Sequence, residues 1–256
     1  MMTIDAHLHL DSDQFASPAD AASFLDQERE KAGISHCVVL HLLAQGWSME
    51  EFGEVLALYP KLHGMVNLNP HDKHCHKNLE QAISDMGFIG LKLHPRLQEF
   101  SIEEDSVSRL LNTAGELKVP VLIDAFPDGT HLQQGFHALK YAELAKKAPN
   151  TNIIIAHMGG HHVLDFLMLA KRIPNIYFDI SYSFLYYRGS SITQNMIYAM
   201  KSMGFNRIFY GSDYPDRTLA ETLKGSLEIF EDYGVVKDDL NKILYNNAAS
   251  FFGFAR

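Results

Sequence analysis

The stretch IIIAHMGG at residues 153–160 decides the fold. Its apolar run is too short for a helix, and it ends at His157, which Met158 and two glycines follow. A short, β-branched run with a glycine boundary is typical of a strand buried on both faces of a parallel sheet. We therefore predict a strand over residues 153–157 with a polar side chain at its carboxyl end.

Seven further runs of this kind lie along the chain and alternate with amphipathic stretches. The eight predicted strands cover residues 3–9, 37–42, 62–69, 89–94, 121–125, 153–157, 176–180 and 207–212. The predicted helices cover residues 19–32, 49–58, 79–86, 107–117, 137–147, 163–172, 193–202 and 220–231. This alternation indicates βα units around a parallel sheet.

Eight strands alternating with eight helices favour a closed (β/α)₈ TIM barrel of the α/β class. An open doubly wound sheet usually carries a glycine-rich phosphate loop after its first strand, and this sequence has none there. The 256 residues match the roughly 250 of such a barrel, so we expect a single domain over residues 1–256. A last helix is predicted over residues 238–252, with Phe251, Phe252 and Phe254 packed on the outside of the barrel.

Charge and cysteine content narrow the classes of function. The chain has 31 acidic and 22 basic residues, a formal net charge of −9, and its basic residues form no runs. We therefore expect a small-molecule substrate, with no nucleic acid or membrane partner. Cys37 and Cys75 are too few for a disulfide framework, and the first residues lack the pattern of a signal peptide. A cytoplasmic location is the resulting expectation.

Polar residues at the carboxyl ends of the predicted strands are the candidates for chemistry, because active sites of such barrels form at this end. His7 and His9 end the first strand, and alternation along a strand places both imidazoles on one side, where they can bind one cation. For this pair alone, two structural histidines are the alternative. His157 ends the sixth strand, and Asp213 follows the eighth as a metal ligand or a general base.

The fourth strand, within GLKLHP at residues 90–95, places Lys92 and His94 on one side and two leucines on the other. A buried lysine needs an anionic partner, so Lys92 would orient an acid or hold the substrate. A lysine that reaches past the rim into solvent fits the pattern equally well. Arg96 follows directly, and its guanidinium can clamp a carboxylate. Lys92, His94 and Arg96 are therefore the predicted substrate-binding residues.

In this order along the chain, the motifs resemble the amidohydrolase superfamily, in particular its amidohydrolase-2 branch, which includes decarboxylases related to aminocarboxymuconate semialdehyde decarboxylase. The resemblance is carried by IDAHLH at 4–9, GLKLHP at 90–95, IAHMGG at 155–160, NIYFDIS at 175–181, GSDYP at 211–215 and NNA at 246–248. It implies that His7, His9 and Asp213 bind one divalent ion, usually zinc. It also implies that His157 polarises the substrate or assists proton transfer, with direct ligation as a second possibility.

One position departs from the family's pattern. The fifth strand, within PVLIDA at 120–125, has Asp124 where the family commonly has a histidine ligand. Aspartate binds zinc or manganese through oxygen, so Asp124 can complete a site of two histidines and two carboxylates. A weaker site is the other outcome, or a metal-free enzyme like the family's lactonases for pyrone carboxylates. The predicted metal ligands are His7, His9, Asp124, His157 and Asp213, with zinc as the ion and manganese as the alternative.

Other titratable residues are predicted to serve structure or solvation. The tract HDKHCH at 71–76 lacks a second ligand pair at zinc-finger spacing, so a solvated loop explains it better. Candidates with an equally ordinary explanation are His41, His161, His162, Arg188 and Arg217. An aromatic-rich segment at 182–187 could provide the contact of a homodimer.

These residues together predict a metal-dependent hydrolase. A divalent ion lowers the pKa of its bound water from about 16 toward 7 and polarises a carbonyl oxygen. Asp213 would take a proton from that water and deliver it to the leaving group, and His157 would stabilise the oxyanion. An arginine would hold a small carboxylate-bearing substrate. A non-oxidative decarboxylase with the same site is the nearest alternative, and a non-catalytic ligand-binding barrel is a third hypothesis.

Overall fold

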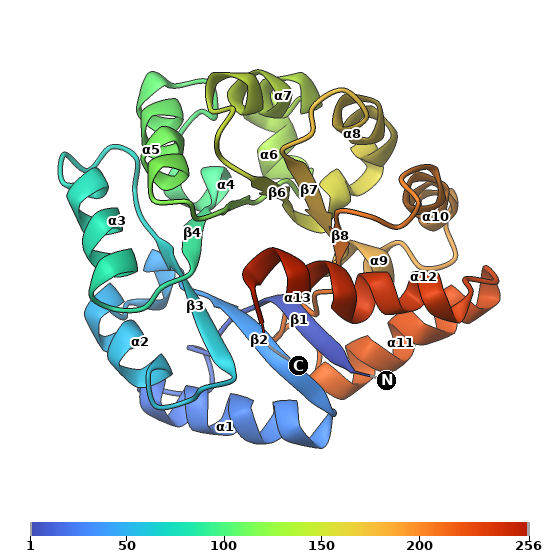
Figure 1. The fold of residues 1–256 in the computed structure, drawn as a ribbon, viewed down its shortest axis with the longest axis horizontal. Coiled ribbons are helices and arrows are strands. Elements are labelled where there is room, and N and C mark those ends of the chain that lie inside the picture. The colour runs from blue at the N-terminus through green and yellow to red at the C-terminus, as the bar shows by residue number, and fades with distance from the viewer. Residues whose placement is uncertain (1, 255–256) are drawn as a thin grey trace.

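The computed structural model describes residues 2–254, which form an eight-stranded barrel surrounded by helices (Figure 1). Its strands are β1 Thr3–Leu8, β2 Ile34–Leu40, β3 Leu62–Asn67, β4 Gly90–Leu93, β5 Val121–Ile123, β6 Ile153–Ile155, β7 Ile176–Asp179 and β8 Ile208–Phe209. Neighbouring strands pair in parallel and in sequence order. The predicted (β/α)₈ barrel is thus confirmed. Residues 1, 255 and 256 of the predicted domain lie outside the described part of the chain.

The eight predicted helices are present, with ends shifted by a few residues. They are α1 Pro18–Lys31, α2 Met49–Leu56, α3 Cys75–Ser84, α5 Asp105–Glu116, α7 Ala138–Lys147, α8 Val163–Ala170, α10 Ser191–Ser202 and α11 Leu219–Asp232. Capping boxes begin two of them, because Ser48 pairs with Glu51 and Thr218 pairs with Glu221. Within residues 2–254, no helix combines the length and the apolar character that crossing a bilayer requires.

Short helices that the sequence analysis did not predict follow three of the strands. They are α4 Pro95–Gln98 after β4, α6 Gly129–Gln133 after β5 and α9 Ser183–Tyr186 after β7. Pro95 at the first turn begins α4, and the Asp128 carboxylate accepts a hydrogen bond from the His131 N–H at the start of α6. Each of these helices therefore lies at the carboxyl end of the barrel, where the candidate site is expected.

Backbone hydrogen bonds close the barrel between β1 and the segment after β8. The Ala6 N–H donates to the Tyr210 carbonyl at 2.9 Å, and the Asp213 N–H donates to the His7 carbonyl at 2.8 Å. The His9 N–H donates to the Tyr214 carbonyl, also at 2.8 Å. The closure therefore places the end of β1 directly beside Asp213.

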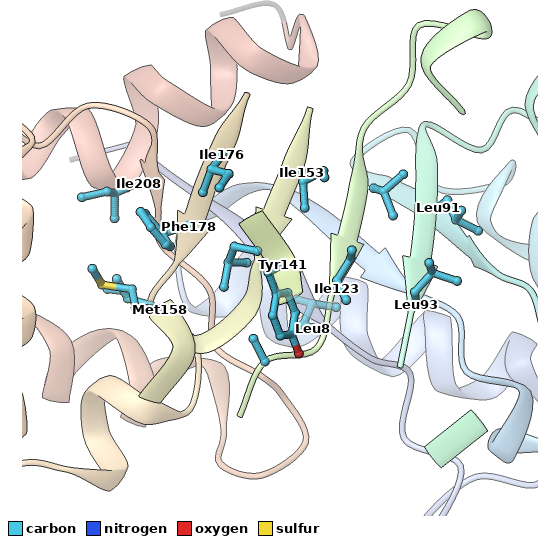
Figure 2. Packing of buried hydrophobic residues seen from close by; sticks show 14 of the residues in the cluster. Leu8, Leu91, Leu93, Ile123, Tyr141, Ile153, Met158, Ile176, Phe178 and Ile208 are labelled. Carbon is cyan, nitrogen blue, oxygen red and sulfur yellow. The ribbon is translucent and has the colours of Figure 1, made fainter. Parts of the chain in front are cut away.

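Apolar side chains fill the space on both sides of the strands. Figure 2 shows outward-facing residues of successive strands in one packed layer, among them Leu91, Leu93, Ile123, Ile153 and Phe178. The inner side of the barrel holds a second cluster that includes Ile4, Ala6, Val38, Leu40, Met65, Leu122, Ile154 and Phe209. Burial on both faces explains why the strands read as continuous apolar runs.

The last helical segment corrects one expectation. It comprises α12 Lys237–Asn241, a π-helical turn at Lys242–Asn246 and α13 Asn247–Phe252, and the predicted packing of its phenylalanines on the outside of the barrel is wrong. Phe251, Phe252 and Phe254 pack against the inner cluster, and the Phe251 ring lies 5.0 Å from the Phe209 ring. The inner side chains would otherwise be open to water at this end, so α13 covers them (Figure 1).

Phe251→Ala should therefore lower the free energy of unfolding by about 2–4 kcal/mol, the range expected for removing a largely buried aromatic ring. Urea denaturation of the variant and the wild type measures the change. Leu58→Ala is the control, because Leu58 is 74% exposed and its loss should change stability by less than about 0.5 kcal/mol. An equally small effect for Phe251→Ala would contradict the role of α13 as a cover for the inner cluster.

Candidate active site

Polar side chains replace the apolar ones inside the barrel at the carboxyl ends of four strands. Asn67, Lys92, Asp124 and Asp179 continue the inward-facing positions of β3, β4, β5 and β7, and each is at most 1% exposed. A buried polar layer of this size is costly unless its members pair with one another or with a ligand. The layer therefore marks the carboxyl end of the barrel as the candidate site.

A bulge in β1 turns His7 toward this layer. Ile4 and Ala6 face the inside, so strict alternation would send His7 outward. Between Asp5 and Leu8, however, β1 advances three residues while its partner β2 advances two. The shift moves Leu8 into the outer cluster and brings His7 inside. His7 and His9 thus lie close together, as strand alternation predicts, although β1 is not a regular strand there.

A left-handed turn after β6 does the same for His157. The backbone φ angles of His157, Met158 and Gly159 are 60°, 50° and 70°. Non-glycine residues seldom adopt these angles, and they concentrate at functional sites. Gly159 is required, because a Cβ atom there would lie 2.1 Å from the Phe166 ring. The glycines of the sequence motif therefore allow the turn that presents His157.

His7, His9 and Asp213 form one compact cluster. The Asp213 Oδ1 atom lies 3.1 Å from His7 Nε2 and 3.5 Å from His9 Nε2. One donor atom from each residue lies within 4.8 Å of the others, a spacing at which they can hold a metal ion together. Exposure of the side chains rises from 1% for His7 to 19% for Asp213, so the cluster opens toward solvent at Asp213.

Three histidines have their Nδ1 atom engaged by an acceptor. His7 Nδ1 pairs with Asp179 Oδ2, His9 Nδ1 with the Leu40 carbonyl and His157 Nδ1 with the Ser181 carbonyl, at 3.0, 2.9 and 3.0 Å. These acceptors assign the N–H to Nδ1 and leave the Nε2 lone pairs for a cation. Metal-binding histidines are usually held in this way.

Asp179 lies at the centre of the candidate site, although its place in the NIYFDIS motif carried no predicted role. Besides His7, its carboxylate accepts hydrogen bonds from the backbone N–H groups of His157 and Ser181 and from the Ser181 hydroxyl. His7, His157 and Asp179 also come close enough to suggest a metal set. The hydrogen bonds explain that arrangement without an ion. The signal available in the sequence was an aspartate that ends a buried strand.

Asp124 and His157 form a second pair beside the cluster. His157 Nε2 lies 3.2 Å from Asp124 Oδ1, but neither residue belongs to the compact set with His9 and Asp213. Within residues 2–254, neither carboxylate oxygen of Asp124 has a hydrogen-bond partner of good geometry, although both are buried. Orphaned carboxylate oxygens of this kind fit a site that receives a cation or a polar substrate group.

Imidazole and guanidinium groups from the segments after β4 and β5 surround Asp124. The predicted substrate-binding residues His94 and Arg96 approach its Oδ2 atom at 3.7 and 3.8 Å, and His131 approaches it at 3.9 Å. Burial lowers the pKa of Lys92, whereas Asp124, Asp213 and Asp179 oppose that effect. Lys92 thus lies inside the barrel, and the alternative in which it reaches solvent is wrong because its side chain is only 1% exposed.

Arg96 is already engaged. One of its terminal nitrogens donates to Asp128 Oδ2 at 2.7 Å, and its Nε atom is buried without a partner among residues 2–254. Asp128, at the start of α6, thus fixes the guanidinium near the site, and the Nε–H remains available as a hydrogen-bond donor. This geometry suits a group that holds an anion in a defined orientation.

Burial and neighbouring charges shift the pKa values of the residues in and beside the cluster. Burial lowers the pKa of His7, but Asp179 and Asp213 outweigh it and raise that pKa to about 9. Burial raises the pKa of Asp179, but His7 and His157 bring it down to about 2. The pKa of Asp213 lies well below its usual value for the same reason, since His7 and His9 outweigh burial. Near neutral pH the cluster therefore combines a protonated His7 with the Asp213 carboxylate, and the Asp179 carboxylate lies against His7 from outside the cluster.

The remaining sequence candidates have other partners. Buried His41 pairs through Nε2 with the Trp47 carbonyl at 2.9 Å. In the 71–76 tract, His71 contacts Glu104 and His76 contacts Thr113. Arg188 pairs with Glu228 and Arg217 with Asp216, and both arginines are exposed by more than a third. The structure brings none of these five residues into the cluster.

Comparisons with known proteins agree with this fold. The model of the amidohydrolase family matches residues 4–254. An uncharacterized TIM-barrel protein from Bordetella bronchiseptica superposes with a TM-score of 0.79 at 19% identity, covering 99% of both chains. A probable 2-pyrone-4,6-dicarboxylic acid hydrolase from Acinetobacter baumannii, solved with citric acid bound, gives 0.73 at 19% identity, with 99% of this chain and 100% of that chain covered.

A decarboxylase is also similar in structure. The 5-carboxyvanillate decarboxylase from Novosphingobium aromaticivorans, complexed with manganese and 4-hydroxy-3-methoxy-5-nitrobenzoic acid, has a TM-score of 0.68 at 14% identity, with coverage of 99% of this chain and 96% of that chain. The comparison with curated proteins gives no match. At such identities the structures establish a common fold, and the family match covers nearly the whole chain.

Replacing Asp179 by asparagine removes the negative charge beneath His7 while keeping the size of the side chain. We expect binding of Mn²⁺ to weaken by about 10–100-fold, the usual effect of losing a partner that orients a metal ligand. Titration of free Mn²⁺ by electron paramagnetic resonance measures the affinity. Asp238→Asn, at an exposed position on α12, should leave it unchanged. Equal affinities for the two variants would contradict the role of Asp179.

The raised pKa of His7 predicts how metal affinity depends on pH. Below about pH 9, His7 is protonated in the ion-free protein, and a cation at Nε2 must displace that proton. The apparent affinity for Mn²⁺ should therefore rise by up to about tenfold per pH unit between pH 6.5 and 8.5. In Asp179→Asn, the pKa of His7 should fall and the slope should flatten at the upper end. A wild-type affinity independent of pH over this range would contradict the assignment of His7 as a ligand.

Proposed function

This chain belongs to the amidohydrolase family, and we propose that it is a metal-dependent hydrolase acting on a small, carboxylate-bearing substrate. Family membership makes the chain an enzyme and leaves no support for a non-catalytic barrel. The observation that carries the proposal is the set of engaged Nδ1 atoms, which leaves His7 and His9 with Nε2 atoms beside the Asp213 carboxylate. His7, His9 and Asp213 would hold the ion.

The donor set suits zinc or manganese, because both accept imidazole nitrogen and carboxylate oxygen. When bound, such an ion supplies a polarised carbonyl group and a water of lowered pKa. Asp124 and His157 would complete the ligand set or act on the substrate from the adjacent position. The Asp124 oxygens support either role, since both roles require an acceptor and neither oxygen has a hydrogen bond of good geometry within residues 2–254.

In the proposed reaction, water adds to the carbonyl carbon, and the bond from that carbon to the leaving group breaks. Asp213 accepts the proton of the water and returns it to the leaving group. Its position supports this role, because it is the most exposed member of the cluster. His157, with its N–H assigned to Nδ1, presents the lone pair of Nε2 beside Asp124, so both residues would accept hydrogen bonds from donor groups of the substrate or would join the ligand set of the ion.

Recognition of a carboxylate is assigned to Lys92 and Arg96. Both lie on the β4 side of the mouth, and the unpaired Nε of Arg96 leaves a donor for an anion. His94 adds a neutral polar group there, because burial lowers its pKa to about 3. A substrate carboxylate would thus bind between the candidate metal cluster and β4.

A decarboxylase that uses the same residues is the second candidate. Its support is an aromatic wall beside His157, where the Phe126 and Tyr182 rings lie 5.9 and 6.2 Å from the imidazole. Such rings pack well against a planar substrate, which is the kind of molecule named for the similar 5-carboxyvanillate decarboxylase. In this version the bond from the substrate carbon to the carboxylate held by Lys92 and Arg96 would break, carbon dioxide would leave, and that carbon would take a proton that Asp213 passes on from water.

Two assays on Mn²⁺-loaded protein separate the candidates. Ring opening of 2-pyrone-4,6-dicarboxylate, followed by loss of ultraviolet absorbance, would support the hydrolase. Release of carbon dioxide from 2,6-dihydroxybenzoate without lactone hydrolysis would contradict it and support the decarboxylase. Absence of both activities with a panel of carboxylated lactones, amides and benzoates would count against the proposed substrate class.

Asp213→Asn should lower kcat by about 10²–10⁴-fold on whichever substrate is turned over, because the proton acceptor is lost. Turnover is measured at a Mn²⁺ concentration shown by titration to saturate the variant, so that weaker ligation does not imitate the effect. Asp238→Asn again serves as the matched control. Near-normal turnover of Asp213→Asn would rule out its role in proton transfer.

A further inference from the structure

A hollow of about 320 Å³ lies beside the candidate site, at the carboxyl ends of β2, β3 and β4. Leu42, Leu43, Asn67, His94, Leu97 and Gln98 contribute to its wall. Small-molecule pockets typically enclose about 300–1,000 Å³, so the hollow can take part of a ligand. None of the residues assigned to bind the metal ion lines it.

His94 connects the hollow to the reacting end of the site. Its side chain lines the hollow, while its Nδ1 atom lies 3.7 Å from Asp124 Oδ2. Asn67, on the neighbouring strand, donates from its amide to the Lys92 carbonyl at 2.9 Å. His94 thus lies between the hollow and Asp124, and a molecule whose carboxylate binds Lys92 and Arg96 would have to pass His94 to reach the hollow.

The amides of the wall have little hydrogen-bonding capacity left. Asn67 Oδ1 accepts from the Leu43 N–H, and Asn67 Nδ2 donates to Gln98 Oε1 as well as to the Lys92 carbonyl. Gln98 Oε1 also accepts from the His94 N–H, and Gln98 Nε2 donates to the Leu68 carbonyl. These bonds hold the wall in one shape and leave few donors for a ligand.

The charge and polarity of the hollow select against an anion. Its described wall contains no lysine or arginine, and Glu99 lies at its edge. Leu43 and Leu97 are 46% and 51% exposed there, so their apolar surfaces would be covered only by a ligand. A carboxylate that covered these leucines would lose its hydration, and the wall of the hollow would offer no positive charge to compensate.

We propose that this hollow binds an uncharged, apolar substituent of the substrate, remote from the carboxylate. The inference rests on the proposed function for the position of that carboxylate. It narrows the substrate class to acids with one charged end and one apolar end. Leu97 is the specificity-determining residue, because it is the most exposed of the three leucines on the wall and lies on α4 directly after Arg96.

The test compares three probes by isothermal titration calorimetry: benzoate, 4-butylbenzoate and terephthalate. In the wild type, the butyl group should strengthen binding at least tenfold over benzoate, since four methylene or methyl groups leave water. The second carboxylate of terephthalate should give no gain. A gain from terephthalate equal to that from the butyl group would overturn the proposal.

Two aspartate variants separate the hollow from a general surface effect. In Leu97→Asp, the gain from the butyl group should fall below about threefold, because the bound alkyl chain would remove water from the aspartate charge without compensating for it. In Leu139→Asp, at a 52% exposed leucine on α7, the full gain should persist. A gain that survives Leu97→Asp would overturn the proposal. A dimer in solution that Leu97→Asp dissociates would assign the hollow to a second copy of the chain and overturn it as well.

A neutral probe keeps this inference distinct from the proposed function. If 4-butylbenzyl alcohol binds the wild type at least fivefold more tightly than Leu97→Asp, the inference that the hollow binds an apolar group is supported, even if none of the acids binds. In that case only the assignment of Lys92 and Arg96 to a carboxylate fails. If the alcohol does not bind the wild type, the hollow does not take an apolar group and the inference is wrong.

Discussion

The site depends on the closure of the barrel between β1 and the segment that follows β8. Backbone hydrogen bonds link His7 to Asp213 and Ala6 to Tyr210, and the buried Asp5 carboxylate accepts from the N–H groups of both His7 and Ser212. Gly211 makes the approach possible, because a Cβ atom there would lie 2.8 Å from the His7 Cβ. Two segments about 200 residues apart in sequence are thereby held at the distance that a shared cation requires.

A second set of contacts fixes the orientation of the imidazoles. At the end of β7, Asp179 accepts a hydrogen bond from His7, and the Ser181 carbonyl accepts one from His157. The Leu40 carbonyl of β2 accepts a hydrogen bond from His9. These acceptors belong to buried, well-packed strands, so the rings cannot rotate freely. The chemistry of the mouth thus depends on groups that need not touch the substrate.

Strained residues and buried polar atoms without good hydrogen bonds are present at the carboxyl end of the barrel. His157 and Asp213 adopt left-handed backbone angles, and the buried Asp124 oxygens have no hydrogen bond of good geometry within residues 2–254. Each such feature opposes folding stability unless the surrounding packing compensates for it. The continuous apolar layers on both sides of the strands provide that compensation, which leaves the mouth free to hold groups in an arrangement suited to binding.

Most of the fold could be predicted from the sequence, because apolar runs that alternate with amphipathic stretches depend on local periodicity. The positions of His7, His9, His157 and Asp213 at strand ends followed from the same pattern. The bulge in β1 and the left-handed turn at His157 could not be predicted, since both arise from contacts between distant segments. For the same reason the role of Asp179 was missed, and the phenylalanines of α13 were placed on the wrong side of the strands.

The most direct test of the account is the metal content and position in protein purified without chelators or added metal. Elemental analysis should find about one zinc or manganese ion per chain, and anomalous diffraction should place it in contact with His7, His9 and Asp213. The same map would show whether Asp124 or His157 joins them. Full activity without a bound metal, or an ion that contacts none of these three residues, would contradict the account.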